Sequence, residues 1–168
     1  KTHRYEPVKV LDDVKDISAS KGSFSVALKN NGTVWTWGSN AGGALGNGST
    51  VAKSIVPVQV PGLENVKQIG AGVFTGYALK NDGTVWAWGL NTKGELGNGG
   101  NGSQSNVPVQ VENLADIVER SAGLDYAMAL KSDGTVWAWG RDVGNILADG
   151  TNTSETYLKP VWLDIGGA

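Results

Sequence analysis

Few residues of this chain have the types and spacing that catalysis requires. The sequence holds a single histidine, His3, and no cysteine. A Ser-His-Asp triad or a histidine-rich metal site therefore has only this one candidate, and thiolate nucleophiles and sulfur-ligated zinc are excluded. His3 precedes the first expected strand, so we interpret it as a solvated terminal residue. The sequence predicts no catalytic residue, no metal site and no cofactor, and hence a protein that is not an enzyme.

Two other groups have a faint resemblance to cation sites. Asp12, Asp13 and Asp16 cluster near the first expected strand, but Lys9 and Lys15 lie among them and indicate a solvated charged turn. The Gly99–Gly102 run is similar to calcium-binding glycine repeats, yet it lacks the carboxylates that a hard cation prefers. We expect no cation at either place.

Charge and hydropathy exclude two classes of partner. The formal net charge is -2, so no overall positive field would recruit a phosphate backbone, and we expect no nucleic-acid partner. No apolar run approaches the ~18 residues of a membrane helix, and we expect no membrane partner. The expected location is extracellular or at the cell surface.

The elements that position the side chains come from an internal repeat. Ala-Leu-Lys recurs at 27–29, 78–80 and 129–131, and each copy is followed by Gly-Thr-Val-Trp and then by Trp-Gly. The period is 51 residues. A fixed period of this length is typical of solenoids and propellers.

Each repeat alternates with period two, as strands require. In the second repeat we expect strands near 66–71, 77–80, 84–88 and 107–111, with Asn81-Asp82-Gly83 as a hairpin turn. Four antiparallel strands per repeat make a propeller blade. The predicted fold class is all-β, a partial β-propeller of three four-stranded antiparallel blades at 14–60, 66–111 and 117–163. Residues 1–13 form an N-terminal segment with an extra strand at Val8–Val10, and residues 164–168 form a tail.

The third strand of each repeat explains the tryptophans. Trp86 and Trp88 point to one face of the blade, whereas Val85 and Ala87 point to the other. Bulky faces can then stack on small faces from blade to blade. Core packing is favoured for these indoles over sugar stacking.

The order of motifs at 57–99, from Pro-Val-Gln-Val through Asp-Gly-Thr-Val-Trp-Ala-Trp-Gly to Gly-Glu-Leu-Gly-Asn-Gly, resembles the regulator-of-chromosome-condensation repeat. The resemblance extends from about Pro7 to Leu163. It implies a seven-bladed ring and functions in protein binding. This sequence has Asn145 and Ala148 where its second repeat has Gly94 and Gly97, and three repeats are present.

Three blades leave two end faces open. The indoles of one end would expose roughly 300–500 Å² of apolar surface, comparable in free energy with the stability of a whole domain. We therefore expect the ring to be completed, either by a homo-oligomer whose copies pair head to tail, by a complementary chain, or by further repeats of a longer protein.

The predicted binding surface comes from comparing the repeats. Two connections vary between them: the one between the first and second strands, and the one after Trp-Gly. Because strands alternate in direction, both connections emerge on one face. Variable loops on a rigid scaffold are typical of binding sites. The candidate binding residues are Lys21, Ser23, Phe24, Val73, Phe74, Thr75, Leu124, Asp125, Tyr126, Leu90, Arg141 and Asp142.

The favoured function is recognition of a protein partner by this face. Two alternatives stay open: a structural or adhesive segment of a bacterial surface protein, and a glycan-binding module.

Overall fold

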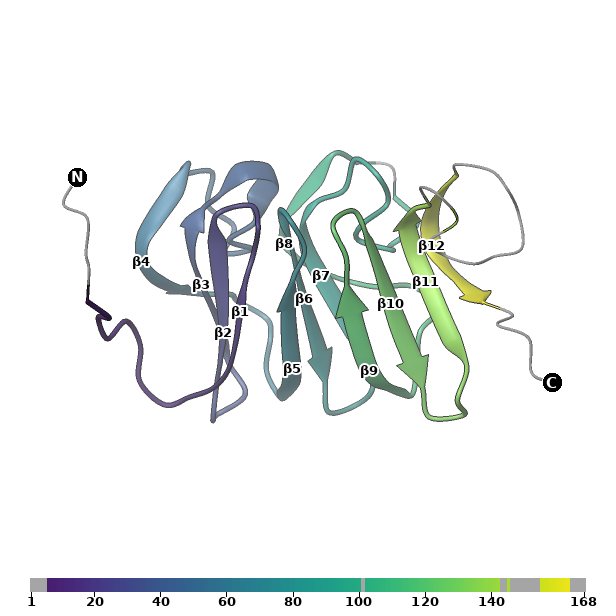
Figure 1. Ribbon diagram of the computed structural model, residues 1–168, viewed down its shortest axis with the longest axis horizontal. Coiled ribbons are helices and arrows are strands. Elements are labelled where there is room, and N and C mark those ends of the chain that lie inside the picture. The colour runs from purple at the N-terminus through teal and green to yellow at the C-terminus, as the bar shows by residue number, and fades with distance from the viewer. Residues whose placement is uncertain (1–5, 101, 143–144, 146–154, 164–168) are drawn as a thin grey trace.

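The computed structural model describes residues 6–100, 102–142, 145 and 155–163. Within these residues the chain forms twelve strands and one short 3-10 turn, η1 (Ala41–Gly43). The strands form three separate four-stranded antiparallel sheets that stand side by side along the long axis (Figure 1). The all-β propeller-blade fold predicted from the repeat is confirmed.

Each sheet uses the strands of one repeat in sequence order. The first sheet contains β1 (Val14–Ala19), β2 (Phe24–Lys29), β3 (Val34–Ser39) and β4 (Lys53–Gln59). The second contains β5 (Val66–Ala71), β6 (Thr75–Lys80), β7 (Val85–Leu90) and β8 (Gln104–Gln110). The third contains β9 (Ile117–Ala122), β10 (Tyr126–Lys131), β11 (Val136–Arg141) and β12 (Thr156–Leu163). We call these sheets blades 1, 2 and 3.

The N-terminal segment differs from expectation. Residues 6–13 form no strand, so the extra strand predicted at Val8–Val10 is wrong. Each blade already takes its fourth strand, β4, β8 or β12, from its own repeat. Both valines are half exposed.

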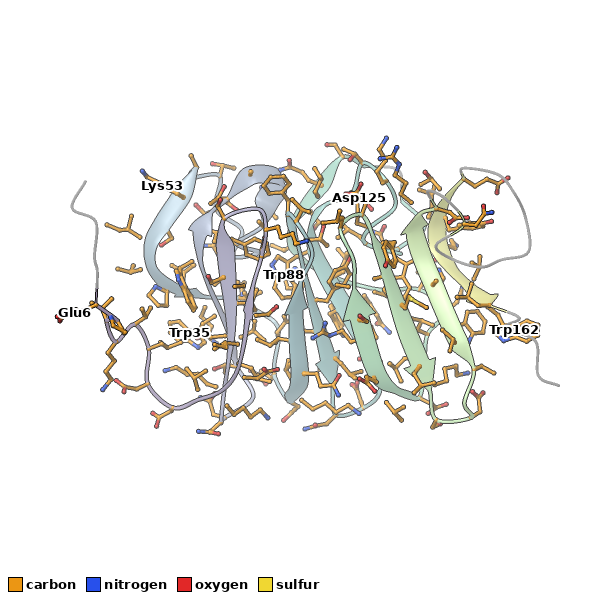
Figure 2. The ribbon with its side chains drawn as sticks, in the orientation of Figure 1. Glu6, Trp35, Lys53, Trp88, Asp125 and Trp162 are labelled. Atoms are coloured by element: carbon orange, nitrogen blue, oxygen red, sulfur yellow. The ribbon has the colours of Figure 1, made fainter. Side chains whose placement is uncertain are left out.

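The core consists mainly of the two interfaces between blades. Trp88 lies in the first, between blades 1 and 2 (Figure 2). It is fully buried there and packs with Phe24, Val34 and Ala44 of blade 1. Trp139 is fully buried in the second, among Tyr77, Ala87 and Leu96 of blade 2. The indole face of each blade therefore packs on the small face of the blade before it, which confirms the stacking expected from the third strand.

Loops join the blades through hydrogen bonds to these indoles. The Trp88 Nε1 donates to the carbonyl of Ala44 at 2.9 Å, and the Trp139 Nε1 donates to the carbonyl of Glu95 at 2.9 Å. Ala44 and Glu95 occupy equivalent positions in the long loops that follow β3 and β7. Each long loop thus reaches across to the next blade and accepts a hydrogen bond from its tryptophan.

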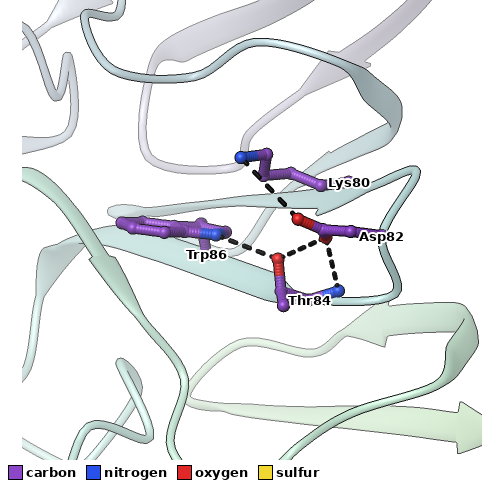
Figure 3. A network of polar contacts seen from close by, with 4 residues as sticks. All are labelled: Lys80, Asp82, Thr84 and Trp86. Atoms are coloured by element: carbon purple, nitrogen blue, oxygen red, sulfur yellow. Dashed lines mark hydrogen bonds and ion pairs between the residues drawn. The ribbon is translucent and has the colours of Figure 1, made fainter.

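The other tryptophan of each third strand is only partly buried. The Trp86 Nε1 donates to the Thr84 hydroxyl at 3.2 Å, and the Thr84 hydroxyl donates to Asp82 (Figure 3). The Lys80 ammonium lies 5.7 Å from the centre of the Trp86 ring. The same arrangement recurs at Trp35 and Trp137, so it braces the hairpin turn in all three blades.

Candidate functional site: a groove on the loop face

Two faces of the blade stack differ in their connections. One, which we call the loop face, carries the β1–β2, β5–β6 and β9–β10 connections and the long loops that follow β3 and β7; it is the upper edge in Figure 1. The other, which we call the turn face, carries the β2–β3, β6–β7 and β10–β11 hairpins. The prediction that both variable connections lie on one face is confirmed by the antiparallel pairing of the strands.

A groove runs along the loop face across all three blades. Its volume is about 380 Å³, and first-strand ends or first loops of every blade line it. We call it the loop-face groove. Its lining residues are Ala19, Lys21, Ala71, Gly72, Val73, Ala122, Gly123, Leu124 and Tyr126.

Small residues make the floor of this groove. Ala19, Ala71 and Ala122 end β1, β5 and β9 at equivalent positions, and glycine follows two of them. A side chain at Gly123 would meet the ring of Tyr126, so that ring lies directly on the backbone of the β9–β10 connection. These alanines are not among the predicted binding residues, because a methyl group offers little contact area of its own. Their recurrence at the end of each first strand was the available signal.

Larger side chains form the walls and the rim. Leu124 is 56% exposed, Val73 and Tyr126 are partly buried, and the Lys21 ammonium is exposed at the blade 1 end. An apolar concave surface with a small number of polar groups at its edge is the usual form of a recognition site. The groove thus unites Lys21, Val73, Leu124 and Tyr126 of the predicted set.

Five other predicted residues lie near the loop face but outside the groove. Asp125 and Arg141 form an ion pair with 3.6 Å between carboxylate and guanidinium, and Figure 2 shows Asp125 at the loop edge. Phe74 is partly buried, and a side chain added at Gly22 would touch its ring. Leu90 lies against Gly42 of the blade 1 loop, and Ser23 borders a separate depression beside Trp37.

Three predicted residues are buried, and their assignment to the binding surface is wrong. Phe24 and Thr75 are each 2% exposed. Phe24 begins β2 opposite Gly38, and its side chain packs in the interface between blades 1 and 2. Thr75 begins β6 opposite Gly89, and its hydroxyl donates to the Leu90 carbonyl.

Asp142 is fully buried, and the repeat explains why. It stands at the position of Asn40 and Asn91, whose side-chain oxygens accept the N–H of Leu45 and Leu96. In blades 1 and 2 this position lies at the base of the long loop, where the asparagine side chain is buried and organises the loop from within.

A buried polar centre lies between blades 2 and 3. The Tyr77 hydroxyl donates to the Glu95 carbonyl at 2.9 Å, the same oxygen that Trp139 uses. Burial raises the pKa of both Tyr77 and the Glu95 carboxyl above their usual values. The guanidinium of Arg120 packs over Gly70, and burial lowers the pKa of Arg120 to about 10. These groups join the two blades beneath the surface.

The described part of the chain offers no alternative candidate for a metal site. No group of three or more His, Asp or Glu side chains among the described residues could hold a metal ion. His3 and Asn101 lie outside those residues. Asp12 is paired with Lys9 at 2.6 Å, and the Asp16 carboxylate accepts the N–H of Ile17. No described helix is long and apolar enough to cross a membrane.

Comparison with known proteins agrees with this architecture. The regulator of chromosome condensation (RCC1) repeat matches residues 31–79 and 82–130, and a second description of the same repeat matches 14–44 and 66–95. The E3 ubiquitin-protein ligase HERC2 of Homo sapiens is 34% identical over 147 residues, which are 84% of this chain and 3% of HERC2. The regulator of chromosome condensation of Mus musculus is 36% identical over 79% of this chain and 32% of its own length.

Solved structures show the same fold. Human WBSCR16 superposes with a TM-score of 0.77 at 22% identity, over 92% of this chain and 40% of that one. Yeast RCC1 (Prp20), in its complex with Kap60, superposes with a TM-score of 0.75 at 22% identity, over 95% and 39%. The chain spans less than a third of the length of the curated relatives just named. With two repeat matches that cover more than half of its residues, the chain belongs to the regulator of chromosome condensation repeat family.

Proposed function

We propose that this chain is a non-enzymatic protein-recognition module, part of a larger propeller, and that its loop-face groove receives the partner. The groove itself carries the proposal. Three successive blades supply one small-residue floor, and apolar walls with an exposed lysine border it. Exposed Leu124 offers an apolar contact that is available without any rearrangement.

The relatives support recognition of proteins as the general role. Yeast RCC1 is seen bound to Kap60, and Prp20p is described with binding properties to Gsp1p and histones. This support is an analogy between folds, because a propeller hosts many functions. The proposed binding surface is therefore based on the groove residues of this chain.

The structure also bears on the glycan alternative. Trp88 and Trp139 are fully buried between blades, so neither ring is free to stack on a sugar. Trp86 is partly buried with Lys80 beside its ring. The apolar groove favours a protein segment as the ligand.

A pair of matched double variants tests the role of the groove. Lys21→Ala with Leu124→Ala alters exposed loop-face side chains, and Asn81→Ala with Ser132→Ala alters exposed turn-face side chains. The immobilised chain and both variants are exposed to the same cell extract, the retained proteins are quantified, and the leading candidate is purified and titrated against all three.

We expect the loop-face variant to lose affinity for that protein by about tenfold or more, and the turn-face variant to bind like the unaltered chain. Equal losses in the two variants would contradict the proposal. So would a set of retained proteins that is indifferent to the loop-face changes.

A further inference from the structure

Trp162 is the one tryptophan that lies outside the third strands. The sequence has seven tryptophans, and the other six belong to β3, β7 and β11. Trp162 lies on β12, an edge strand of blade 3, and the residue is 54% exposed. Figure 2 shows it at the edge of the molecule beside β12, away from the loop edge that carries Asp125.

The exposure of Trp162 does not come from the position of blade 3 at the end of the stack. The equivalent residue of blade 2 is Gln110, which pairs with Trp86 across the strands as Trp162 pairs with Trp137. Gln110 is exposed although blade 3 packs on blade 2, and Gln59 of blade 1 is exposed too. A further blade packed in the same way would therefore leave Trp162 open to solvent.

Trp162 has an aromatic neighbour, which distinguishes it from an isolated apolar side chain on a surface. Residues directly opposite each other in an antiparallel pair project to the same face of the sheet, with Cβ atoms about 4.5–5.5 Å apart, so Trp137 and Trp162 stand side by side. Their rings do not stack on each other, because the ring pair found within the described residues is Tyr77–Trp139. The two indoles therefore offer adjacent aromatic surface, and we call this pair the rim platform.

Polar groups border the rim platform. The Lys131 ammonium lies 5.9 Å from the centre of the Trp137 ring and 3.8 Å from the Asp133 carboxylate. The Trp137 Nε1 donates to the Thr135 hydroxyl at 3.2 Å, whereas the indole N–H of Trp162 has no acceptor among the described residues. The platform thus combines apolar ring surface with a cation, a carboxylate and an N–H donor, and the charges of its lysine and aspartate cancel.

This combination matches the surface of a neutral sugar. The C–H groups on one face of a pyranose ring form a flat apolar surface that can pack on an indole, and the hydroxyl groups at its edge both donate and accept hydrogen bonds. In β-linked glucose the ring hydroxyls are all equatorial, so both faces of the ring are apolar. The balanced charge of Lys131 and Asp133 gives no advantage to an acidic or a basic ligand.

We propose that Trp137 and Trp162 form a stacking site for a neutral glycan of β-linked glucose rings, and that Lys131 and Asp133 bind its hydroxyl groups. This is a second binding function, separate from recognition of a protein in the loop-face groove. The site lies near the β10–β11 hairpin of the turn face, because Trp137 stands near the start of β11. It uses neither of the indoles that are fully buried between blades.

Transfer of the second indole from blade 3 to blade 2 tests the site. Trp162→Gln gives blade 3 the residue that blade 2 has at this position, and Gln110→Trp gives blade 2 a partner for Trp86, which also has a lysine beside its ring. The unaltered chain, the Trp162→Gln variant and the double variant are titrated with cellohexaose, a linear chain of β-linked glucose, by isothermal titration calorimetry. Two-dimensional NMR of the 15N-labelled proteins reports which indole N–H groups respond, and thermal melts confirm that each variant is folded.

We expect the unaltered chain to bind one cellohexaose and Trp162→Gln to weaken the affinity by about tenfold or more, because the exposed ring is lost. Trp162→Tyr should keep most of the affinity, because an aromatic ring remains. The double variant should recover binding, and the N–H that responds to the sugar should change from that of Trp137 to that of Trp86.

Absence of binding at cellohexaose concentrations up to about 10 mM would overturn the inference, as would equal affinities of the unaltered chain and Trp162→Gln. A double variant that binds no better than Trp162→Gln would also contradict it. So would tighter binding of decaproline than of cellohexaose, because a proline-rich segment can also pack on exposed aromatic rings. The groove variant with Lys21→Ala and Leu124→Ala should bind cellohexaose like the unaltered chain, so this proposal and the proposed function can fail separately.

Discussion

The backbone and the side chain of Glu95, in the second long loop, make different contacts. Its backbone carbonyl accepts hydrogen bonds from Tyr77 and Trp139, which fixes the loop against blade 3. Its side chain is buried with it, and the carboxylate accepts the Lys93 N–H at 2.6 Å. Burial opposes the charged form and raises the pKa of the Glu95 carboxyl. The equivalent residue of blade 1 is Ala44, so this carboxyl is not needed for the hydrogen bond to the indole.

The raised pKa of Glu95 makes stability depend on pH in a defined direction. The folded protein binds this proton more tightly than the unfolded chain, so its contribution to stability is present at low pH and is lost as pH rises from about 4.5 through the folded-state pKa. Glu95→Gln removes the titration but keeps an acceptor for Lys93. The free energy of unfolding of the unaltered chain minus that of the variant should fall across this window, as measured by urea unfolding at a series of pH values.

Asp82 provides a control, because its pKa shift and its effect on the pH dependence of stability are opposite in sign to those of Glu95. The hydrogen bonds from the Thr84 hydroxyl and N–H lower the pKa of its carboxyl. Stability that depends on Asp82 is therefore present above pH 3.8 and is lost as pH falls below it. Asp82→Asn should remove that loss without disturbing the turn, because Asn31 makes the same hydrogen bonds in blade 1. A Glu95→Gln difference that is independent of pH would contradict the account of its burial.

The strands and turns could be predicted from the sequence because period-two alternation and the turn glycines recur at a fixed interval. The shared face of the variable loops followed from strand direction alone. Burial at loop boundaries could not be predicted in the same way. Phe24 and Thr75 adjoin a variable loop in the sequence, but pairing with Gly38 and Gly89 places them in the sheet.

The long loops were also beyond sequence reasoning. Their glycines predict left-handed turns, but only the structure shows that Gly46 lies on the indole of the next blade. Asn40 and Asn91 organise the long loops of blades 1 and 2 from inside, and Asp142 is buried at the equivalent position of the repeat. The groove floor could not be predicted from side-chain chemistry, because Ala19, Ala71 and Ala122 shape the groove by being small.

The contact between a loop and the next blade can be measured with two glycines of similar conformation. Gly46 and Gly62 both have left-handed backbone, with φ of 61° and 74°, but a Cβ at Gly62 would meet no atom within 4 Å. Gly62→Ala should cost about 1–2 kcal/mol for the backbone alone. Gly46→Ala should cost a further 1–3 kcal/mol, approximately, because the methyl group enters the Trp88 ring.

Chemical denaturation of the two variants gives this comparison directly. Equal losses of stability would mean that the loop can move away from the indole at no cost.

The whole molecule is a stack with direction. Within the described residues, the long loop of blade 1 packs on the indole of blade 2, and the long loop of blade 2 packs on the indole of blade 3. The loop-face groove runs across this stack and depends on the three blades keeping their relative positions. The proposed recognition groove and the interfaces between blades are therefore separate surfaces of the same scaffold.

Hydrogen exchange at the indole N–H groups tests the central claim of a directional stack most directly. In a 15N-labelled sample, two-dimensional NMR resolves each indole, and single Trp→Phe variants assign them. The N–H groups of Trp88 and Trp139 should exchange slowly, because each is buried and donates to a loop carbonyl. The N–H of Trp37, for which the described residues supply no acceptor, should exchange rapidly. A Trp37 N–H as slow as that of Trp88 in the isolated chain would contradict the account.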